Sequence, residues 1–370
     1  MKKFYPIFSV LIVLAMLLSA CQNTTAPAEA PAAEEPAAEA PAAEEPAAEE
    51  PAAMMYKVCE VTDAGGIDDK SFNATAYKGI ENAMAELGVE GKYLESQQQT
   101  DYEKNINAFI EEGCDLIVTV GFLLGDATAA AAEANPDQSF AIIDYGYDPV
   151  IPNVLGLVYA TDEAAFLAGY LAAGMTETGK VGTFGGIQIP TVTAIMDGFA
   201  MGVKYYNAEK GTDVAVLGWD EEAQTGLFAG NFESTDDGRN LAESLMDEGA
   251  DIIMPVAGPV GLGAAAAVQQ RGNAYIIGVD SDWYESASNY ADVTLTSVLK
   301  KMDLSVFDVT KQVVDGEFAG GFFSGTLENG GVGIADFHDV DGMVSDEMKA
   351  ELDALKAAII AGDIQTSPAQ

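Results

Sequence analysis

Short apolar runs alternate with helix-like segments along most of this chain, and this alternation constrains its fold more than any other feature. The runs have the length of buried strands, and the segments between them carry apolar residues at helical spacing. A strand–helix–strand order calls for a parallel sheet covered by helices on both faces. We therefore predict an α/β fold.

The elements fall into two series that are separated by a long helix expected over residues 162–175. In the first series the expected strands are residues 58–62, 92–96, 116–120, 140–144 and 154–158, and the expected helices are residues 73–87, 101–112 and 125–134. In the second series the expected strands are residues 181–184, 214–219, 252–256 and 275–279, and the expected helices are residues 191–205, 236–248 and 261–270.

Two series of this kind predict two doubly wound parallel-sheet lobes with a hinge and an interlobe cleft. We assign residues 54–160 to an N-lobe and residues from about 161 to about 299 to a C-lobe. A strand at residues 293–299 and a helix at residues 302–314 are expected to carry the chain back to the first lobe. For that reason we also assign residues from about 300 to 370 to the N-lobe.

The N-terminus has the pattern of a secretory signal peptide. Lys2 and Lys3 precede an apolar run from Ile7 to Leu18, which is short for a stable membrane span. The following Ser19-Ala20-Cys21 completes a sequence similar to a bacterial lipobox. We predict a signal peptide over residues 1–20 and lipidation of Cys21, so that the mature protein is lipid-anchored to the cell membrane on its extracytoplasmic side. An ordinary signal peptide with an incidental cysteine is the alternative.

A low-complexity segment follows Cys21 and extends to residue 53. The unit Pro-Ala-Ala-Glu-Glu recurs there with small variations. A proline at about every fifth position interrupts any helix, and the segment has too few apolar side chains to form a core. We predict a disordered Pro/Ala/Glu linker that tethers the folded part to its lipid.

The chain is strongly acidic, with 59 Asp and Glu residues against 17 Lys and Arg residues. Such a surface repels nucleic acid and anionic lipid headgroups, so we expect no nucleic-acid partner and membrane contact only through the lipid. Besides Cys21 the chain has Cys59 and Cys114. A disulfide between them is open to a protein outside the cytoplasm, but we expect buried free thiols.

The predicted carboxyl ends of the strands locate a candidate site, because ligands of open parallel sheets bind beyond them. These ends are rich in Gly, Asp and aromatic residues: Asp63–Gly66, Gly121–Phe122, Asp144–Tyr145, Gly185–Gly186, Trp219–Asp220, Ala257–Gly258 and Asp280–Asp282. They contain no arginine, the residue that binds phosphate and carboxylate in a bidentate manner. The set favours a neutral, flat ligand such as a nucleoside, whose base stacks on an aromatic ring.

The residue types of the chain argue against most enzyme classes. His338 is the single histidine, so a histidine-dependent triad or a multi-histidine metal site is not expected. Neither a G-x-S-x-G motif nor a Walker A loop is present. We predict a protein that is not an enzyme and needs no cofactor or metal. A metal-dependent nucleoside hydrolase that uses Asp63, Asp68 and Asp69 is the alternative.

The stretch VTDAGGIDDKSFN at residues 61–73 resembles the signature of the basic membrane protein family, the PnrA-like nucleoside-binding lipoproteins of ABC transporters. Later stretches resemble further motifs of that family: TVGF at residues 119–122 with Asp126, GNFES at residues 230–234, AGPVG at residues 257–261, IGVDSD at residues 277–282 and LTSVLKK at residues 295–301. The resemblance covers nearly the whole body. It implies a type I periplasmic-binding-protein-like fold and a monomer that captures purine nucleosides for an ABC transporter permease. A nucleoside sensor on the same fold stays open.

The resemblance also implies the ligand-binding residues, which are Asp63, Phe72, Asn73, Asp126, Phe232, Gly258, Asp280 and Lys300. It implies that Phe72 and Phe232 enclose the purine from opposite lobes and that Asp280 and Lys300 hold the ribose hydroxyls. By the same resemblance, Asp126 contacts a base edge. Asp68 and Asp69 are expected instead to favour the start of the following helix.

Two departures from the family pattern stand out. Trp283 replaces what is often a polar residue, and the stretch from Trp219 to Gly230 is longer than usual.

Overall fold

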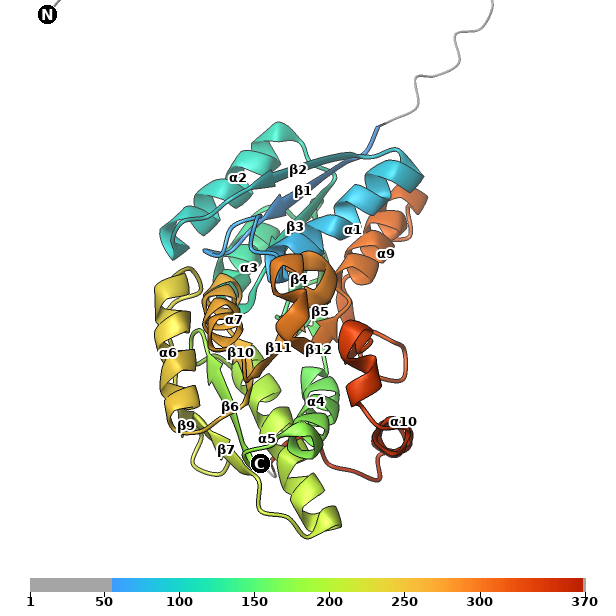
Figure 1. The fold of residues 1–370 in the computed structure, drawn as a ribbon. Helices are drawn as coiled ribbons and strands as arrows, with labels where there is room; N and C mark the ends of the chain where they lie inside the picture. The colour runs from blue at the N-terminus through green and yellow to red at the C-terminus, as the bar shows by residue number, and fades with distance from the viewer. Residues whose placement is uncertain (1–54, 369–370) are drawn as a thin grey trace, which may run out of the picture. The chain divides into compact units, whose positions relative to one another are not determined.

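The computed structural model describes residues 55–368, which form two lobes, each around a six-stranded sheet (Figure 1). The predicted signal peptide, Cys21 and the predicted linker lie outside the described residues. Within the described residues, no helix has the length and apolar character needed to cross a membrane.

The N-lobe sheet has the strand order β13-β5-β4-β3-β1-β2, and all neighbouring strands are parallel. Its strands are β1 (Lys57–Val61), β2 (Glu90–Leu94), β3 (Leu116–Val120), β4 (Ser139–Ile143), β5 (Val154–Tyr159) and β13 (Gly321–Gly325). On one face the core includes residues of α1 (Phe72–Leu87) and α9 (Met302–Asp315), and on the other it includes residues of α2 (Tyr102–Glu112) and α3 (Gly125–Ala134). Because both faces are covered, the central strands are almost entirely apolar.

The C-lobe sheet has the strand order β14-β12-β11-β10-β6-β7 and is parallel except for the pair β12–β14. Its strands are β6 (Lys180–Gly185), β7 (Ala215–Leu217), β10 (Ile252–Val256), β11 (Tyr275–Asp280), β12 (Thr294–Lys300) and β14 (Val332–Ile334). Its main helices are α4 (Thr161–Met175), α5 (Pro190–Lys210), α6 (Thr235–Asp247), α7 (Pro259–Arg271) and α10 (Asp346–Ile360). A short hairpin, β8 (Trp219–Asp220) and β9 (Thr225–Gly226), and the short helix α8 (Trp283–Ser286) complete the lobe.

The two sheets repeat one topology, since the order β2-β1-β3-β4-β5 corresponds to β7-β6-β10-β11-β12. The predicted α/β fold with two doubly wound lobes is confirmed.

The C-terminal part of the chain departs from the expected division into lobes. We assigned residues 300–370 to the N-lobe, but only α9 and β13 pack there. β14 pairs with β12, and α10 buries Met348, Leu352 and Leu355 in the C-lobe core. The chain therefore passes between the lobes three times, after β5, after β12 and after β13.

The prediction of free thiols at Cys59 and Cys114 is wrong, because the structure joins them in a disulfide with a Cα–Cα distance of 6.1 Å. Cys59 lies on β1, and Cys114 comes just before β3, its neighbour in the sheet. The two residues are 55 positions apart. The strand order brings them together, and the spacing in the sequence does not reveal it.

Candidate ligand-binding site

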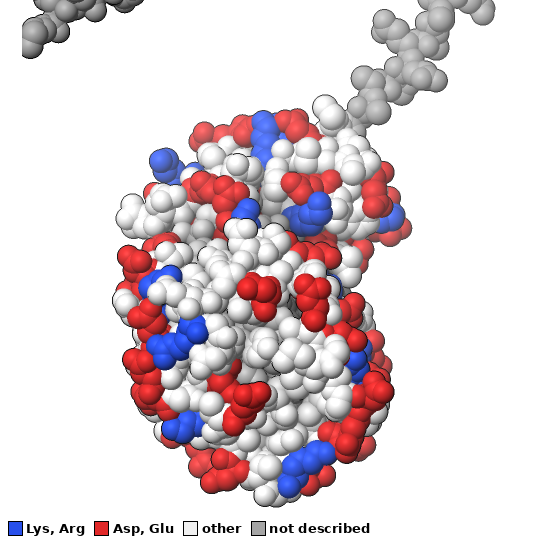
Figure 2. Space-filling view, viewed as in Figure 1, with Lys and Arg blue, Asp and Glu red and all other residues white. Residues whose placement is uncertain are grey.

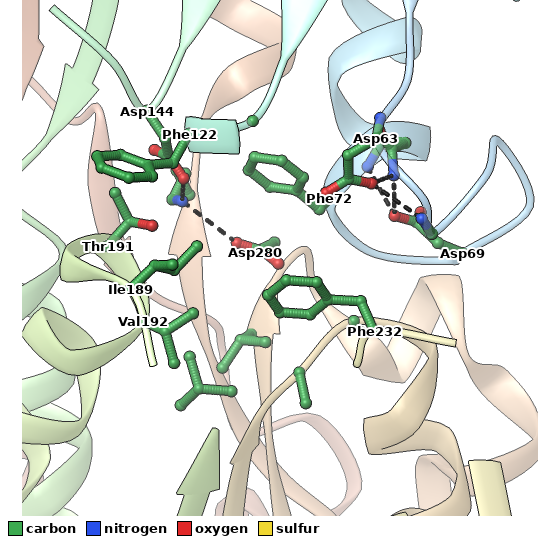
Figure 3. Close-up of a pocket in the computed structure, with 18 of the residues that line it drawn as sticks. Asp63, Asp69, Phe72, Phe122, Asp144, Ile189, Thr191, Val192, Phe232 and Asp280 are labelled. Atoms are coloured by element: carbon green, nitrogen blue, oxygen red, sulfur yellow. Dashed lines mark hydrogen bonds and ion pairs between the residues drawn. The ribbon is translucent and has the colours of Figure 1, made fainter. Parts of the chain in front are cut away.

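A cavity lies between the two lobes, at the carboxyl ends of strands from both sheets (Figure 3). The N-lobe contributes residues that follow β1, β3 and β4, and the C-lobe contributes residues at or after the ends of β10, β11 and β12. The first turns of α5 add an apolar wall made of Ile189, Val192 and Ile195. This is the position that the topology of the sheets predicts.

Two phenylalanines project into the cavity from opposite lobes, as Figure 3 shows. Phe72 is the first residue of α1, and Phe232 lies in the loop between β9 and α6. Phe232 packs directly over Gly186, where a Cβ atom would collide with the ring. The glycine at the end of β6 therefore permits the close approach that Phe232 needs.

A polar network from the N-lobe lines one end of the cavity. The Asn73 side-chain amide donates to Asp63 Oδ1 at 2.8 Å and to Asp69 Oδ2 at 3.1 Å. The Asp69 carboxylate also accepts from the backbone N–H groups of Ser71, Asn73 and Ala74 at 2.7–3.0 Å. Asp69 thus holds the start of α1, as predicted, and its burial raises its pKa to about 7 although these N–H donors oppose the shift.

Lys300 joins the lobes at the other end of the cavity. Its Nζ lies 2.7 Å from Asp144 Oδ2 in the N-lobe and 3.7 Å from Asp280 Oδ1 in the C-lobe, and all three side chains are buried. Burial alone would lower the pKa of Lys300, but the two carboxylates outweigh it and hold the pKa above its usual value. The ammonium stays charged, and it lies 4.9 Å from the centroid of the Phe72 ring.

Asp144 and Asp280 occupy corresponding positions in the two lobes. Asp144 directly follows β4, and Asp280 ends β11, the corresponding strand of the C-lobe. The first residues of these strands, Ser139 and Tyr275, pair with the first residues of β3 and β10, so the two aspartates lie equally far along their strands. Both backbones are left-handed, with φ of 66° and 69°. This conformation is uncommon outside glycine, and aspartate tolerates it better than most residues.

Direct hydrogen bonds join the lobes beside the cavity. The Ser71 hydroxyl lies 3.0 Å from the carbonyl oxygen of Val279 and 2.9 Å from Asp280 Oδ2. The Ser281 hydroxyl donates to the carbonyl oxygen of Lys70 at 3.0 Å. These contacts come from the loop before α1 and the end of β11, so they hold the lobes together at the site itself.

The structure brings most of the predicted site residues to this cavity, namely Asp63, Phe72, Asn73, Phe232, Gly258, Asp280 and Lys300. Asp126 is the exception, because its side chain is exposed in the first turn of α3 and does not line the cavity. A short 3-10 turn, Phe122–Leu124, separates Asp126 from the end of β3. Phe122 takes the place beside the cavity instead.

Other wall residues were absent from the predicted site. Asp144 and Phe122 stand at strand ends, so the rule that located the site also contained the signal for them. Ile189, Thr191 and Val192 reach the cavity from the start of α5 and carry no local sequence signal.

Trp283 lies behind the cavity wall and not in it. It is fully buried against Gly278 and Gly261, and its indole N–H donates to the carbonyl oxygen of Val279 at 3.0 Å. The longer stretch from Trp219 forms the β8–β9 hairpin, which Asp197 holds through the Trp219 indole N–H and the Gln224 amide. Both departures from the family pattern are thus accommodated outside the cavity.

The three carboxylates that the alternative hydrolase would use differ in their surroundings. Asp68 is exposed, and Asp69 is engaged by the backbone of α1. Among residues 55–368, no group of three or more His, Cys, Asp or Glu side chains is arranged to hold a metal ion.

A model of the family of PnrA-like ABC transporter substrate-binding proteins matches residues 56–369 of the chain. The chain belongs to this family. The predicted resemblance is confirmed, and the protein is an ABC transporter substrate-binding protein of the PnrA-like family. The family is one of solute-binding proteins, with which the prediction of a protein that is not an enzyme agrees.

Named relatives of this PnrA-like protein cover most of both chains. The ABC transporter nucleoside-binding protein BmpA of Lactococcus lactis is 32% identical over 329 residues, which are 83% of this chain and 88% of that one. Basic membrane protein A of Borreliella burgdorferi is 33% identical over 315 residues, which are 83% and 86% of the two chains. A solved ABC transporter solute-binding protein from Aeropyrum pernix is 29% identical, with a TM-score of 0.75 over 84% of this chain and 92% of that one.

Proposed function

We propose that this PnrA-like protein captures purine nucleosides outside the cytoplasm and presents them to an ABC transporter permease. The observation that carries the proposal is the pairing of two phenylalanines from opposite lobes with a buried Asp–Lys–Asp group in one cavity. The first pair suits a flat base, and the second group suits a ribose.

The base is placed between Phe72 and Phe232. Stacking of a base on an aromatic side chain contributes roughly 1–3 kcal/mol, and it does not depend on which base is bound. Because the two rings belong to different lobes, a base between them favours the closed arrangement over an open one. Binding energy would thereby be used to close the cleft.

The ribose is placed at Asp280 and Lys300. A carboxylate accepts hydrogen bonds from neighbouring hydroxyl groups, and an ammonium donates to their oxygens. The wall of the cavity contains four aspartates, Asp63, Asp69, Asp144 and Asp280, against the single cation Lys300. This excess of carboxyl groups disfavours a phosphorylated ligand and supports a neutral nucleoside.

Delivery to a membrane permease follows from the family and from the N-terminal sequence. Lipidation of Cys21 would anchor the chain, and the Pro/Ala/Glu linker would let the binding domain act as a monomer at some distance from the bilayer. The face drawn in Figure 2 has mainly acidic charges with basic side chains between them, which supports the expectation that nucleic acid is not a partner. A nucleoside sensor on the same fold would differ from a transport protein in the partner that it binds.

Calorimetry with adenosine, guanosine and inosine tests the proposal, with ribose and AMP as comparison ligands. We expect tight binding of at least one nucleoside and much weaker binding of AMP. Phe72→Ala and Asp280→Ala should each weaken binding tenfold or more, which corresponds to about 1.4 kcal/mol. Asp126→Ala is the matched control and should leave the affinity unchanged, since Asp126 lies outside the cavity wall. Binding of a sugar or peptide without any nucleoside would refute the proposal.

A further inference from the structure

A buried glutamate lies close to Asp63 and Asp69 of the cavity wall. Glu60 is on β1, its residue is 0% exposed, and neither carboxyl oxygen has a hydrogen-bond partner among the described residues. Burial raises the pKa of Glu60 well above its usual value, and the nearby Asp69 and Asp63 raise it further. Burial and the neighbouring carboxyl groups thus favour the protonated form of Glu60.

Within residues 55–368, the groups that raise the pKa values of these three carboxyls are acidic, and the cation of the cavity wall, Lys300, pairs with Asp144 and Asp280. Asp63 and Asp69 come from the loop after β1, Tyr77 comes from α1, and Tyr93 is the register partner of Glu60 on β2. Asp280 and Glu233 act on Asp63 from the C-lobe, and Tyr102 faces it from α2. Carboxyl groups that share a buried site do not all ionise together, because like charges at close range disfavour the ionised forms.

Asp63 and Asp69 both line the cavity, but both oxygens of Asp69 accept hydrogen bonds from the start of α1, so Asp63 is the member best placed to contact a base. Its Oδ1 already accepts from the backbone N–H of Gly65 at 3.0 Å and from the Asn73 amide at 2.8 Å. Its Oδ2 lies on the side of Gly121 and the Phe72 ring, where the base is placed. Oδ2 is thus the atom whose protonation a bound base would sense, and Asn73 links this carboxyl directly to Asp69.

We propose that Asp63 discriminates between purine nucleosides according to where the carboxyl cluster of Glu60, Asp63 and Asp69 holds its proton. The inference rests on the proposed function. In this inference position 1 of the purine faces Asp63 Oδ2. When Asp63 is ionised, Oδ2 only accepts, which suits guanosine and inosine because their N1–H donates. When Asp63 carries the proton, Oδ2 donates, which suits adenosine because its N1 accepts.

The two kinds of nucleoside then respond to pH in opposite directions. Burial raises the pKa of Asp63, and the pKa of Asp69 lies at about 7. At pH values below about 7 the cluster keeps its proton and adenosine is favoured. At higher pH the proton goes to solvent and inosine is favoured. Adenosine binding at neutral pH should take up a proton, and inosine binding should release one.

Calorimetry of the full chain with adenosine and inosine at pH 5.5, 7.0 and 8.5 tests this inference. Two buffers with different ionisation enthalpies count the protons exchanged on binding. We expect the ratio of the two Kd values to change tenfold or more between the extreme pH values, with proton exchange of opposite sign. A constant ratio without proton exchange would overturn the inference while the proposed function stands. No nucleoside binding at any pH would overturn the proposed function itself.

The variant Asp63→Asn provides a sharper test. Its side-chain oxygen should keep the hydrogen bonds from Gly65 and Asn73, which leaves the NH2 group to donate toward the base. We expect a preference for adenosine at every pH and loss of the pH dependence. Asp126→Asn makes the same chemical change at an exposed position outside the cavity and should behave as the parent protein. An Asp63→Asn protein that binds nucleosides and keeps the parental pH dependence would refute the role of Asp63.

Discussion

In both lobes the first strand of the series ends at the cavity, but the two strands differ in what they bring to it. Val58 on β1 pairs with the first residue of β3, and Val181 on β6 pairs with the first residue of β10, so these two valines occupy corresponding positions. By the same count Glu60 corresponds to Thr183 and Asp63 corresponds to Gly186. The Thr183 hydroxyl donates to the Met254 carbonyl oxygen at 2.7 Å, whereas Glu60 has no partner among the described residues. The same topology therefore places carboxyl groups at the end of the first strand in the N-lobe and a glycine at the corresponding position in the C-lobe.

The fourth strand of each series shows the opposite relation. Asp144 and Asp280 match in position, residue type and backbone conformation, and both face Lys300. The two lobes are thus alike where they meet over one lysine and unlike where they would grip a base. This difference assigns closure to the symmetric part of the site and ligand selection to the asymmetric part.

The largest effect is expected at Lys300. Lys300→Met leaves Asp144 and Asp280 buried without their cation, and removing one partner of a buried ion pair costs about 3–5 kcal/mol. Chemical denaturation should show this loss, and nucleoside affinity should fall by 100-fold or more. Asp144→Asn should cost less, because Asp280 still pairs with the lysine, and the double variant should recover part of the loss. Additive losses in the double variant would show that the two residues act independently.

The disulfide between Cys59 and Cys114 is expected to stabilise the N-lobe and not the C-lobe. Among the described residues only the N-lobe has cysteines. A disulfide typically stabilises the folded state by about 2–4 kcal/mol, because it restricts the unfolded chain. The double variant Cys59→Ser/Cys114→Ser should lower N-lobe protection in hydrogen exchange while α4 and α5 keep theirs. Equal loss of protection in both lobes would mean that they unfold as one unit.

Glu60→Gln tests the contrast between the two first strands directly. Since the pKa of Glu60 is raised in the folded protein, its stabilising contribution is present below the unfolded value of about 4.5 and is lost as pH rises through the folded value. The variant should therefore be more stable than the parent protein at pH 7, because Gln carries no charge that burial would penalise. The gain should vanish at pH 4. Glu103→Gln, an exposed change in the same lobe, is the control in thermal unfolding, and an identical pH profile for both variants would contradict the assignment.

The smallest effect is expected at the hydrogen bonds between the lobes. Ser71→Ala removes the hydroxyl that contacts Val279 and Asp280 but leaves the cavity wall intact. A single buried hydrogen bond contributes about 1 kcal/mol, so affinity should fall several-fold. Small-angle scattering without ligand should show a more open average. An unchanged affinity would place closure at Lys300 alone.

The sequence predicted the long buried elements well, because their periodicity is local. Strands β3 and β10 and helix α3 have the predicted bounds. The strands β13 and β14 were not predicted, since short strands in a glycine-rich tail are defined only by the sheets that they join. Helix α10 was not predicted either, although its buried residues Met348, Leu352 and Leu355 recur at helical spacing. The same distinction explains the disulfide, which depends on strand order and not on spacing.

At the site, the strand-end rule predicted residues that end or follow a strand, whereas Phe72, Asn73 and Phe232 were predicted through the family resemblance. Asp63 and Asp280 follow directly from the strand-end rule. Asp126 failed because the 3-10 turn after β3 carries it away from the cavity. The partnerless state of Glu60 could not be predicted, because it depends on what packs over β1 in three dimensions.

The three passages of the chain between the lobes have a consequence for biosynthesis. The N-lobe sheet is complete only with β13, and the C-lobe core is complete only with α10. Neither lobe can therefore finish folding on the ribosome before nearly the entire chain has emerged. A chain that folds this late can still pass through a membrane channel in its unfolded form, which suits the predicted signal peptide.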